Sequence, residues 1–427
     1  MSTAVCIASE QTRRAPEIVA PPTHVVFSWT LAGNVIYAGS QFGILSVLAK
    51  LGNRATVGQY ALALAITAPV FMFTNLQLRG VQATDARDEY SFADYFTLRS
   101  LATLAAVTAT GFIVAVTHYD RTTQAVVLLV AAAKAIESFS DVIAGYLQKH
   151  ERLDQVARSL MLRGVLSLGV FALAFWMTRS LVASVAALAI TWAAVVALYD
   201  ARMARRLGRS PLFRFSRQRL VALFKVSLPL GFVMALVSLN VNIPRYLLER
   251  KLGIAELGIF ASIAYLMTAI NLIVLALGQA VSARMSRLLA SGELVRFRAL
   301  TRKLIGFAAA LGLCGVSCAA AFGREVLALI YRPEYAAHSR LLVVMLVAAS
   351  VGAAASFLGF GMTAARCFRA QVPIMAATVG TAALVTNALL PLCGLIAASY
   401  ALGAAGLVQA ISSYLVLNSA LKKLEAR

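Results

Sequence analysis

Three ionisable side chains lie close together within a stretch of sequence that is otherwise apolar. Lys134, Glu137 and Asp141 are separated by three and four residues, so on a helix that turns about 100° per residue they lie on one face. Arg163 lies in the next apolar stretch. If the chain turns back near Arg152, Asp141 and Arg163 are equally far from the turn. We therefore expect a direct ion pair between Asp141 and Arg163.

Two chemical roles are open for this group of four residues. Its two cations and two carboxylates balance, and a neutral group is a poor binding site for an anion. The group is either a structural network of ion pairs or a site for a coupling ion or substrate, because carboxylates in apolar segments also serve in proton relays. Glu137 is the better candidate for ion coupling, since Asp141 already has an expected partner.

A second set of polar residues lies at or near the ends of apolar stretches, away from carboxylates. The candidates for binding an anionic group such as a diphosphate are Arg79, Arg245, Arg284, Asn240 and Asn242. Arginine suits phosphates because its guanidinium forms two parallel hydrogen bonds. The alternative is that these arginines flank membrane spans and extend to the interface, a role that fits Arg99 and Lys225 better still. Pro244 predicts a break in the helix just before Arg245.

The composition places these residues in a membrane protein. Of 427 residues, 60% are hydrophobic and 13% are charged, with a mean hydropathy of +0.79, whereas soluble domains have about 25% charged residues. The formal net charge is +21. We interpret this excess as a marker of membrane topology and expect no nucleic-acid partner.

Cysteine and histidine give no sign of a cofactor or a catalytic site. The five cysteines and four histidines are scattered along the chain without the spacing of a metal site. No nucleophile, base and orienting group occur together. We therefore expect no metal, no cofactor and no enzymatic activity.

The apolar segments predict about twelve transmembrane helices, because a crossing helix needs about 20 apolar residues. The expected spans are 25–49, 55–78, 97–118, 123–147, 157–178, 181–200, 221–244, 257–283, 304–323, 341–365 and a pair within 370–421. Pro391 and Gly394 predict the hairpin between that last pair.

The distribution of basic residues predicts the orientation of these spans. With a cytoplasmic N-terminus, about 25 of the 39 basic residues fall on the cytoplasmic side and about 10 outside. An even number of spans then places both termini in the cytoplasm. The expected parts are a tail over 1–24, a first lobe over 25–200, a basic linker over 201–219, a second lobe over 220–420 and a tail over 421–427.

A short repeat agrees with this division into two halves of six spans. Lys50-Leu51-Gly52 is followed by Gly58, and about 200 residues later Lys251-Leu252-Gly253 is followed by Gly258. Six is an even number, so both halves enter the membrane in the same direction. We expect them to be related by an axis along the membrane normal, with a central cavity between them.

Several short motifs resemble those of bacterial lipopolysaccharide and polysaccharide flippases, members of the multidrug, oligosaccharidyl-lipid and polysaccharide exporter superfamily. The motifs are Leu76-Gln77-Leu78-Arg79, Ala83-Thr84-Asp85, Tyr95-Phe96-Thr97-Leu98-Arg99, Asn242-Ile243-Pro244-Arg245-Tyr246, Glu256-Leu257-Gly258-Ile259-Phe260 and Ala276-Leu277-Gly278-Gln279. The resemblance covers nearly the whole chain. The chain is short for such proteins and lacks a separate extra pair of helices at its C-terminus.

The resemblance implies a fold, a substrate and a location. The fold is all-α, with two six-helix lobes that rock about a central cavity lined by spans 1, 2, 7 and 8. The substrate is an oligosaccharide linked to undecaprenyl diphosphate, which moves from the cytoplasmic to the periplasmic leaflet of the bacterial inner membrane, driven by an ion gradient. The expected partners are membrane lipids, a glycan polymerase and export machinery. The alternatives are a drug or metabolite antiporter on the same scaffold and, less favoured, a membrane-embedded glycan polymerase or ligase.

Overall fold

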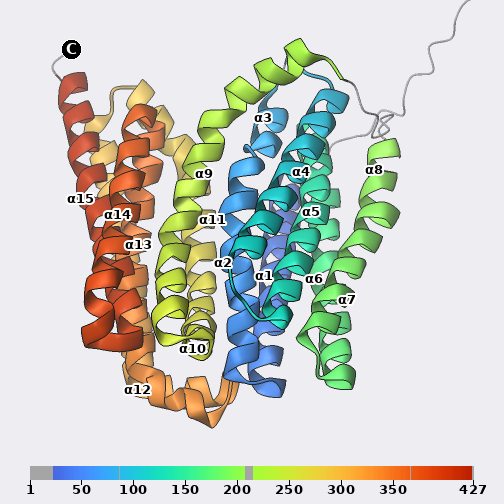
Figure 1. The fold of residues 1–427 in the computed structure, drawn as a ribbon. Helices are drawn as coiled ribbons and strands as arrows, with labels where there is room; N and C mark the ends of the chain where they lie inside the picture. The colour runs from blue at the N-terminus through green and yellow to red at the C-terminus, as the bar shows by residue number, and fades with distance from the viewer. Residues whose placement is uncertain (1–22, 86, 207–214, 366, 426–427) are drawn as a thin grey trace, which may run out of the picture.

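The computed structural model describes residues 23–85, 87–206, 215–365 and 367–425, and every element in these ranges is helical. The first group of helices comprises α1 (Thr23–Leu51), α2 (Arg54–Thr74), α3 (Leu78–Thr84), α4 (Phe92–Val116), α5 (Arg121–Lys149), α6 (Leu153–Thr178), α7 (Leu181–Val195), η1 (Val196–Asp200) and α8 (Ala201–Arg206). The second comprises α9 (Arg217–Leu252), α10 (Ile254–Tyr265), α11 (Met267–Ala290), α12 (Leu294–Ile330), η2 (Pro333–His338), α13 (Ser339–Ala364), α14 (Phe368–Cys393), η3 (Gly394–Ile396) and α15 (Ala397–Glu425). Figure 1 shows the two groups as two lobes standing side by side.

The apolar lengths of these helices confirm a multi-pass membrane protein. Within the described ranges, nine helices are long and apolar enough to cross a membrane, or ten if the bent pair 254–265 and 270–278 forms one span. The stretch Arg369–Lys423 counts once there although it contains both α14 and α15, and α5 is not among the nine. With these two additions the helices account for the twelve expected crossings. Large side chains such as Phe112, Ile190 and Leu392 are exposed on the outside, as a lipid-facing surface requires.

Three helices differ from the expected spans. The second span is not one helix, because α2 ends at Thr74 and Leu76 and Gln77 take left-handed backbone conformations before α3 begins. By contrast, α9 continues through Pro244 to Leu252, so the break expected at this proline is wrong. The ninth span is also longer than expected, since α12 begins at Leu294 and ends at Ile330.

The expected tails and linker fall partly outside the described residues. Of the N-terminal tail, residues 1–22 lie outside, as do 207–214 of the basic linker and 426–427 of the C-terminal tail. The described part of the linker is helical on both sides, in α8 and in the first turn of α9. The hairpin expected near Pro391 turns at Gly394, where the positive φ of 55° favours glycine.

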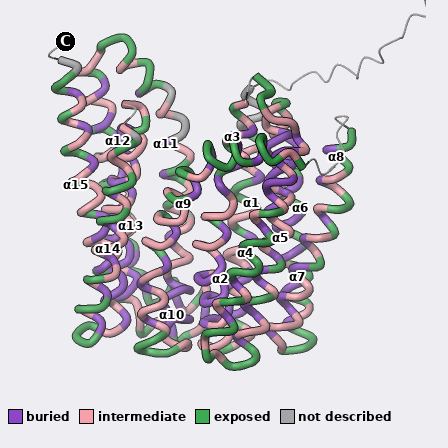
Figure 2. The backbone as a smooth tube through the Cα atoms, turned by 45° about the horizontal axis from the view of Figure 1, so that its top comes forward, coloured by how far each residue is buried: buried purple, intermediate pink, exposed green. Residues whose placement is uncertain are grey.

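The two lobes meet where the repeated glycines lie. A Cβ atom on Gly58 would lie 1.8 Å from the carbonyl oxygen of Ile254, and one on Gly258 would lie 2.1 Å from that of Arg54. The backbones of α2 and α10 therefore touch directly, which only residues without a side chain permit. Figure 2 shows buried residues gathered at this end of the molecule, where α2 and α10 lie side by side. We call it the closed end.

Polar contacts between the lobes reinforce the closed end. Arg332, which precedes η2, donates hydrogen bonds from Nε and Nη2 to the carbonyl oxygen of Lys50 at 3.1 and 2.8 Å. Arg54 at the start of α2 forms an ion pair of 3.2 Å with Glu334. Both contacts join the first lobe to the second, and they lie at the turns between helices. The contacts at this end thus involve both packing and charge.

Candidate functional site

A buried arginine organises the first of two charged clusters. The Arg99 side chain is fully buried, and its Nη2 lies 2.8 Å from Oδ2 of Asp141. Its Nη1 donates to the side-chain oxygen of Asn75, the residue after α2. Arg79 on α3 approaches the other oxygen of Asp141 at 3.7 Å and donates to Gln148. We call Asn75, Arg79, Arg99, Asp141 and Gln148 the Asp141 cluster.

The Asp141 cluster corrects two expectations. Arg99 does not extend to the membrane interface but lies inside the lobe. The expected ion pair between Asp141 and Arg163 is also wrong. Its geometric argument assumed that α6 packs along α5, whereas α6 lies mainly against α1 and α7. Arg163 consequently faces Glu137, and Asp141 faces α3 and α4.

The second cluster surrounds Glu137, and four helices contribute to it. Tyr37 of α1 donates to Oε1 of Glu137 at 2.9 Å, and Lys134 of α5 donates to Oε2 at 2.8 Å. Arg163 of α6 lies farther away, with Nη1 at 3.9 Å from Oε1. The two cations also lie over the Trp192 ring of α7, at 5.7 Å for Lys134 and 5.9 Å for Arg163. We call these five residues the Glu137 cluster.

The two clusters together carry more positive than negative charge. Lys134 and Arg163 balance Glu137 and Asp141, but Arg79 and Arg99 add two further cations. The four residues singled out in the sequence are balanced as expected, and the structure adds Arg79 and Arg99 to them. The Arg79 and Lys134 side chains retain 35% and 29% exposure, so they remain open to a ligand while Arg99 is sealed.

Arg245 lies in the interior of α9, with two polar partners on the same helix face. It donates to the side-chain oxygen of Asn242 at 3.2 Å, and Asn242 donates in turn to the carbonyl oxygen of Ser238. Nε of Arg245 and the side-chain oxygen of Asn240 are buried without a hydrogen-bond partner among the described residues. An unpaired buried donor is costly, so the Arg245 guanidinium retains capacity for an anion.

Tyr265 belongs to the second lobe but lies near the Glu137 cluster of the first lobe. It ends α10 at the bend before α11. Tyr265, Tyr37 of the Glu137 cluster and Tyr246, which follows Arg245, pack against the same hydrophobic core. The Glu137 cluster and Arg245 therefore face a common region where the lobes approach each other.

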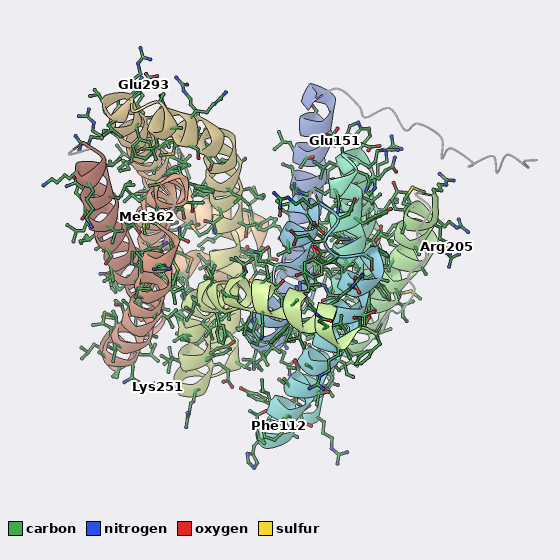
Figure 3. All side chains as sticks on the ribbon, turned by 90° about the horizontal axis from the view of Figure 1, so that it is seen from above. Phe112, Glu151, Arg205, Lys251, Glu293 and Met362 are labelled. Atoms are coloured by element: carbon green, nitrogen blue, oxygen red, sulfur yellow. The ribbon has the colours of Figure 1, made fainter. Side chains whose placement is uncertain are left out.

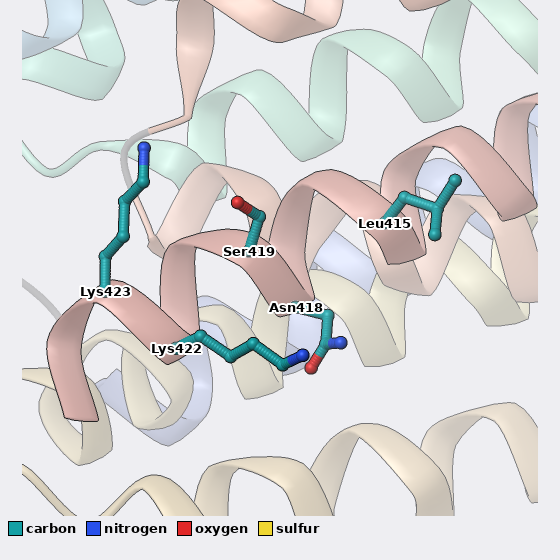
Figure 4. A pocket seen from close by; sticks show the side chains of 5 residues that line it. All are labelled: Leu415, Asn418, Ser419, Lys422 and Lys423. Carbon is teal, nitrogen blue, oxygen red and sulfur yellow. The ribbon is translucent and has the colours of Figure 1, made fainter. Parts of the chain in front are cut away.

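Arg284 lies apart from both clusters. It is exposed near the end of α11, beside a surface hollow that Arg287 and Glu293 also line. A second hollow involves α15 alone, because Leu415, Asn418, Ser419, Lys422 and Lys423 line it (Figure 4). Their side chains leave the helix in different directions and do not converge. Figure 3 is a view from the end opposite the closed end, with Glu151 and Arg205 on one lobe and Glu293 on the other.

Sequence reasoning missed several residues of this region. Tyr37 and Tyr265 contact or face the charged groups, as does Asp200, which accepts a hydrogen bond from Ser140. Each is a single polar residue in or near an apolar run, and such residues give no periodic signal. Among the described residues, no group of three or more His, Cys, Asp or Glu side chains is placed to hold a metal ion.

Comparison with known proteins gives consistent matches. Residues 26–289 match the family described as polysaccharide biosynthesis protein. The capsular polysaccharide biosynthesis protein CapF of Staphylococcus aureus is 29% identical over 321 residues, which is 75% of this chain and 80% of CapF.

Solved structures of transporters share the fold. The MATE transporter VcmN of Vibrio cholerae superposes with a TM-score of 0.65 at 14% identity, covering 94% of this chain and 96% of VcmN. An inward-facing multidrug resistance transporter of the MATE family, in the MOP superfamily, gives a TM-score of 0.61 at 14% identity, covering 96% and 98%. A MOP superfamily transporter of Pyrococcus furiosus gives 0.59 at 14% identity, covering 94% and 95%. These likenesses establish the two-lobe transporter fold.

Proposed function

Because this chain belongs to the polysaccharide biosynthesis protein family, we propose that it is a flippase for a lipid-linked oligosaccharide. The family and the transporter fold indicate a membrane transporter in polysaccharide synthesis rather than an enzyme. In our proposal the substrate is a sugar unit on undecaprenyl diphosphate, and it moves from the cytoplasmic to the periplasmic leaflet.

The observation that carries this proposal is the surplus of positive charge on partly exposed side chains within an apolar shell. Asp141 is shared between Arg99 and Arg79, and the pair with Arg79 is the longer, at 3.7 Å against 2.8 Å. Arg99 keeps Asp141 neutralised when Arg79 turns to a diphosphate. Lys134 and Arg245 supply further donors from the region between the lobes. Guanidinium groups bind such an anion through paired, charge-assisted hydrogen bonds.

A drug antiporter on the same scaffold is the second candidate, since multidrug transporters share the fold. The surplus of positive charge in the two clusters argues against an antiporter for positively charged drugs, because these side chains would repel them. A glycan polymerase or ligase has no support from a catalytic arrangement among the described residues.

The transport cycle we propose uses the two ends of the molecule in turn. In this structure the lobes are joined at the closed end. In our proposal this end faces the periplasm, an orientation that the distribution of basic residues supports. The diphosphate enters from the cytoplasmic side, between Arg79 and Arg245, while the polyprenyl tail stays in lipid. Separation of α2 from α10 then exposes the sugar to the periplasm. Arg284, near the cytoplasmic end of α11, attracts the headgroup at the entrance.

Replacing the open arginines is expected to stop glycan export. Arg79→Gln and Arg245→Gln each remove a guanidinium that our proposal assigns to the diphosphate, so we expect at least a tenfold loss, since a charge-assisted hydrogen bond is worth about 1.5–3 kcal/mol. Surface glycan and lipid-linked intermediates are measured in the native host, with the chromosomal gene deleted and each variant supplied on a plasmid.

The control is Lys225→Gln, which removes a charge from an exposed position on the same helix as Arg245. We expect it to export normally. Complete intermediates retained on the cytoplasmic leaflet in the deletion strain support a flippase. Single units exposed outside would indicate a polymerase, and normal glycan with altered drug sensitivity would indicate an antiporter.

The proposed topology places both termini in the cytoplasm of a bacterial inner membrane, where a glycan polymerase and export machinery are the proposed partners. In a variant without its native cysteines, Arg205→Cys is expected to resist an impermeant maleimide in intact cells. Lys251→Cys, at the closed end, is expected to react under the same conditions. Reaction at residue 205 and protection at residue 251 would reverse the orientation and the direction of transport.

A further inference from the structure

A carboxylate without a cation lies beside the Glu137 cluster. The Asp200 side chain is 2% exposed, and its Oδ2 accepts a hydrogen bond of 2.6 Å from the hydroxyl of Ser140. In the described part of the chain it forms no ion pair, although Arg163 lies within electrostatic reach. A buried, ionised carboxylate without a partner is costly, and protonation removes that cost.

The backbone at Asp200 is also unusual. The residue ends η1, a single π-helical turn of Val196–Asp200 inserted between α7 and α8. Such turns widen the helix by one residue and occur often at functional sites. Here the turn brings Asp200 to face α5, where Ser140 lies.

Arg163 has unused hydrogen-bonding capacity in the same place. Its side chain is 7% exposed, and Nε and Nη1 have no hydrogen-bond partner among the described residues. Its distance of 3.9 Å to Glu137 is the longest of the polar contacts to that carboxylate, which keeps Lys134 and Tyr37 at 2.8 and 2.9 Å. If Arg163 moves away, Glu137 therefore still has Lys134 and Tyr37 as partners.

Among the described residues around Asp200, Arg163 is the one buried cation. The groups that act on Asp200 are Ser140 of α5 and Ser159 and Arg163 of α6. Its nearest polar or charged neighbours along the chain are Tyr199 of η1 and Arg202, Arg205 and Arg206 of α8. The three arginines of α8 are exposed, Tyr199 donates to Gln155, and α7 contains no ionisable residue.

From this arrangement we propose that Asp200 is a proton-binding site and that Arg163 alternates between Glu137 and Asp200. In the conformation described here Arg163 faces Glu137, and Asp200 takes up a proton from water. When Arg163 turns to Asp200, the carboxyl group releases its proton to water. The resulting carboxylate then forms an ion pair with Arg163. Only the coupling of this exchange to transport rests on the proposed flippase activity. Proton binding at Asp200 can therefore be measured without a glycan substrate.

Infrared spectroscopy of the purified full-length protein in lipid nanodiscs tests the proposal. As pH is raised, the C=O stretching band of a protonated carboxylic acid is expected to disappear in the wild type. The band is expected to be absent in Asp200→Asn, present in Glu137→Gln and restored in Asp200→Glu. Loss of the band in Glu137→Gln but not in Asp200→Asn, or no titrating band in the wild type, would overturn the assignment.

Two further variants test the role of the neighbours and remain informative if Asp200→Asn does not fold. Ser140→Ala removes a donor to the charged form and Arg163→Gln removes the cation, so each is expected to move the midpoint upward by about one pH unit or more. Unchanged midpoints in both would contradict the site. Because no substrate is present, failure here leaves the flippase proposal intact. A titrating band in the wild type together with unimpaired glycan export by Asp200→Asn would refute a coupling role alone.

Discussion

Gly58→Ala is expected to drive the lobes apart at the closed end. The added methyl carbon would lie 1.8 Å from the carbonyl oxygen of Ile254, and the opposing atom belongs to backbone that cannot rotate away. Overpacking of this kind costs about 1–3 kcal/mol, which corresponds to a shift of roughly 5- to 150-fold in the population of the conformation described here. Transport is expected to fall with it, because the cycle has to return to this conformation.

The shift is measurable by cross-linking across the lobe interface. Arg54 and Glu334 form an ion pair between the lobes, so cysteines at these two positions, in a protein without its native cysteines, report whether the closed end is formed. A disulfide needs Cα atoms within about 7 Å, so a short bismaleimide is the cross-linker, and we expect at least fivefold slower cross-linking when Gly58→Ala is added. Gly306→Ala is the matched control, since a methyl group there meets nothing within 4 Å. Equal rates in the two variants would show that the glycine contact does not govern the interface.

Asp141→Ala is expected to give the largest loss of stability. Arg99 is fully buried, and removing Asp141 leaves its guanidinium with Asn75 as its hydrogen-bond partner. Breaking one side of a buried ion pair costs about 3–5 kcal/mol. We expect a marked drop in the unfolding temperature in detergent and in the yield of protein from membranes.

Two comparisons separate loss of this pair from loss of any surface charge. Glu293→Ala removes a carboxylate that pairs with Arg296 on the surface, and such pairs contribute about 0.2–1 kcal/mol. The double variant Asp141→Leu, Arg99→Met removes both charges of the buried pair and is expected to recover much of the lost stability. If Asp141→Ala and Glu293→Ala unfold at the same temperature, Arg99 is not held by Asp141 as described.

Much of the fold could be predicted from local sequence, because the membrane imposes a simple rule. A segment that crosses lipid has to satisfy its backbone hydrogen bonds internally, so a charge-free run of sufficient length becomes a helix. The same reasoning fails at the break between α2 and α3, because the expected span 55–78 runs through it. It also fails at Asn75, where the side chain accepts hydrogen bonds from Arg99 and Ser138 beside the break after α2. Those partners are distant in sequence, and periodicity cannot reveal them.

The repeat had more structural meaning than its length suggested. The glycines of the two halves, Gly58 and Gly258, lie against each other at the lobe interface. Spacing alone could show that the halves correspond but not that the corresponding residues touch. For the charged residues, by contrast, spacing along the sequence predicted the wrong pair. Equal distance from a turn suggested that Asp141 faces Arg163, and the packing of α6 against α1 placed Arg163 beside Glu137 instead.

Hydrophobicity, charge-free length and short repeats can be read from the printed sequence, and they were enough to predict a helical membrane protein with two related halves. Which charges form ion pairs could be learned only from the folded chain, because an ion pair depends on the rotation and packing partner of each helix. A change of one residue in register turns a side chain by about 100°. That is why Arg99 is found inside the lobe, Arg245 within an unbroken helix, and Asp200 without a cation.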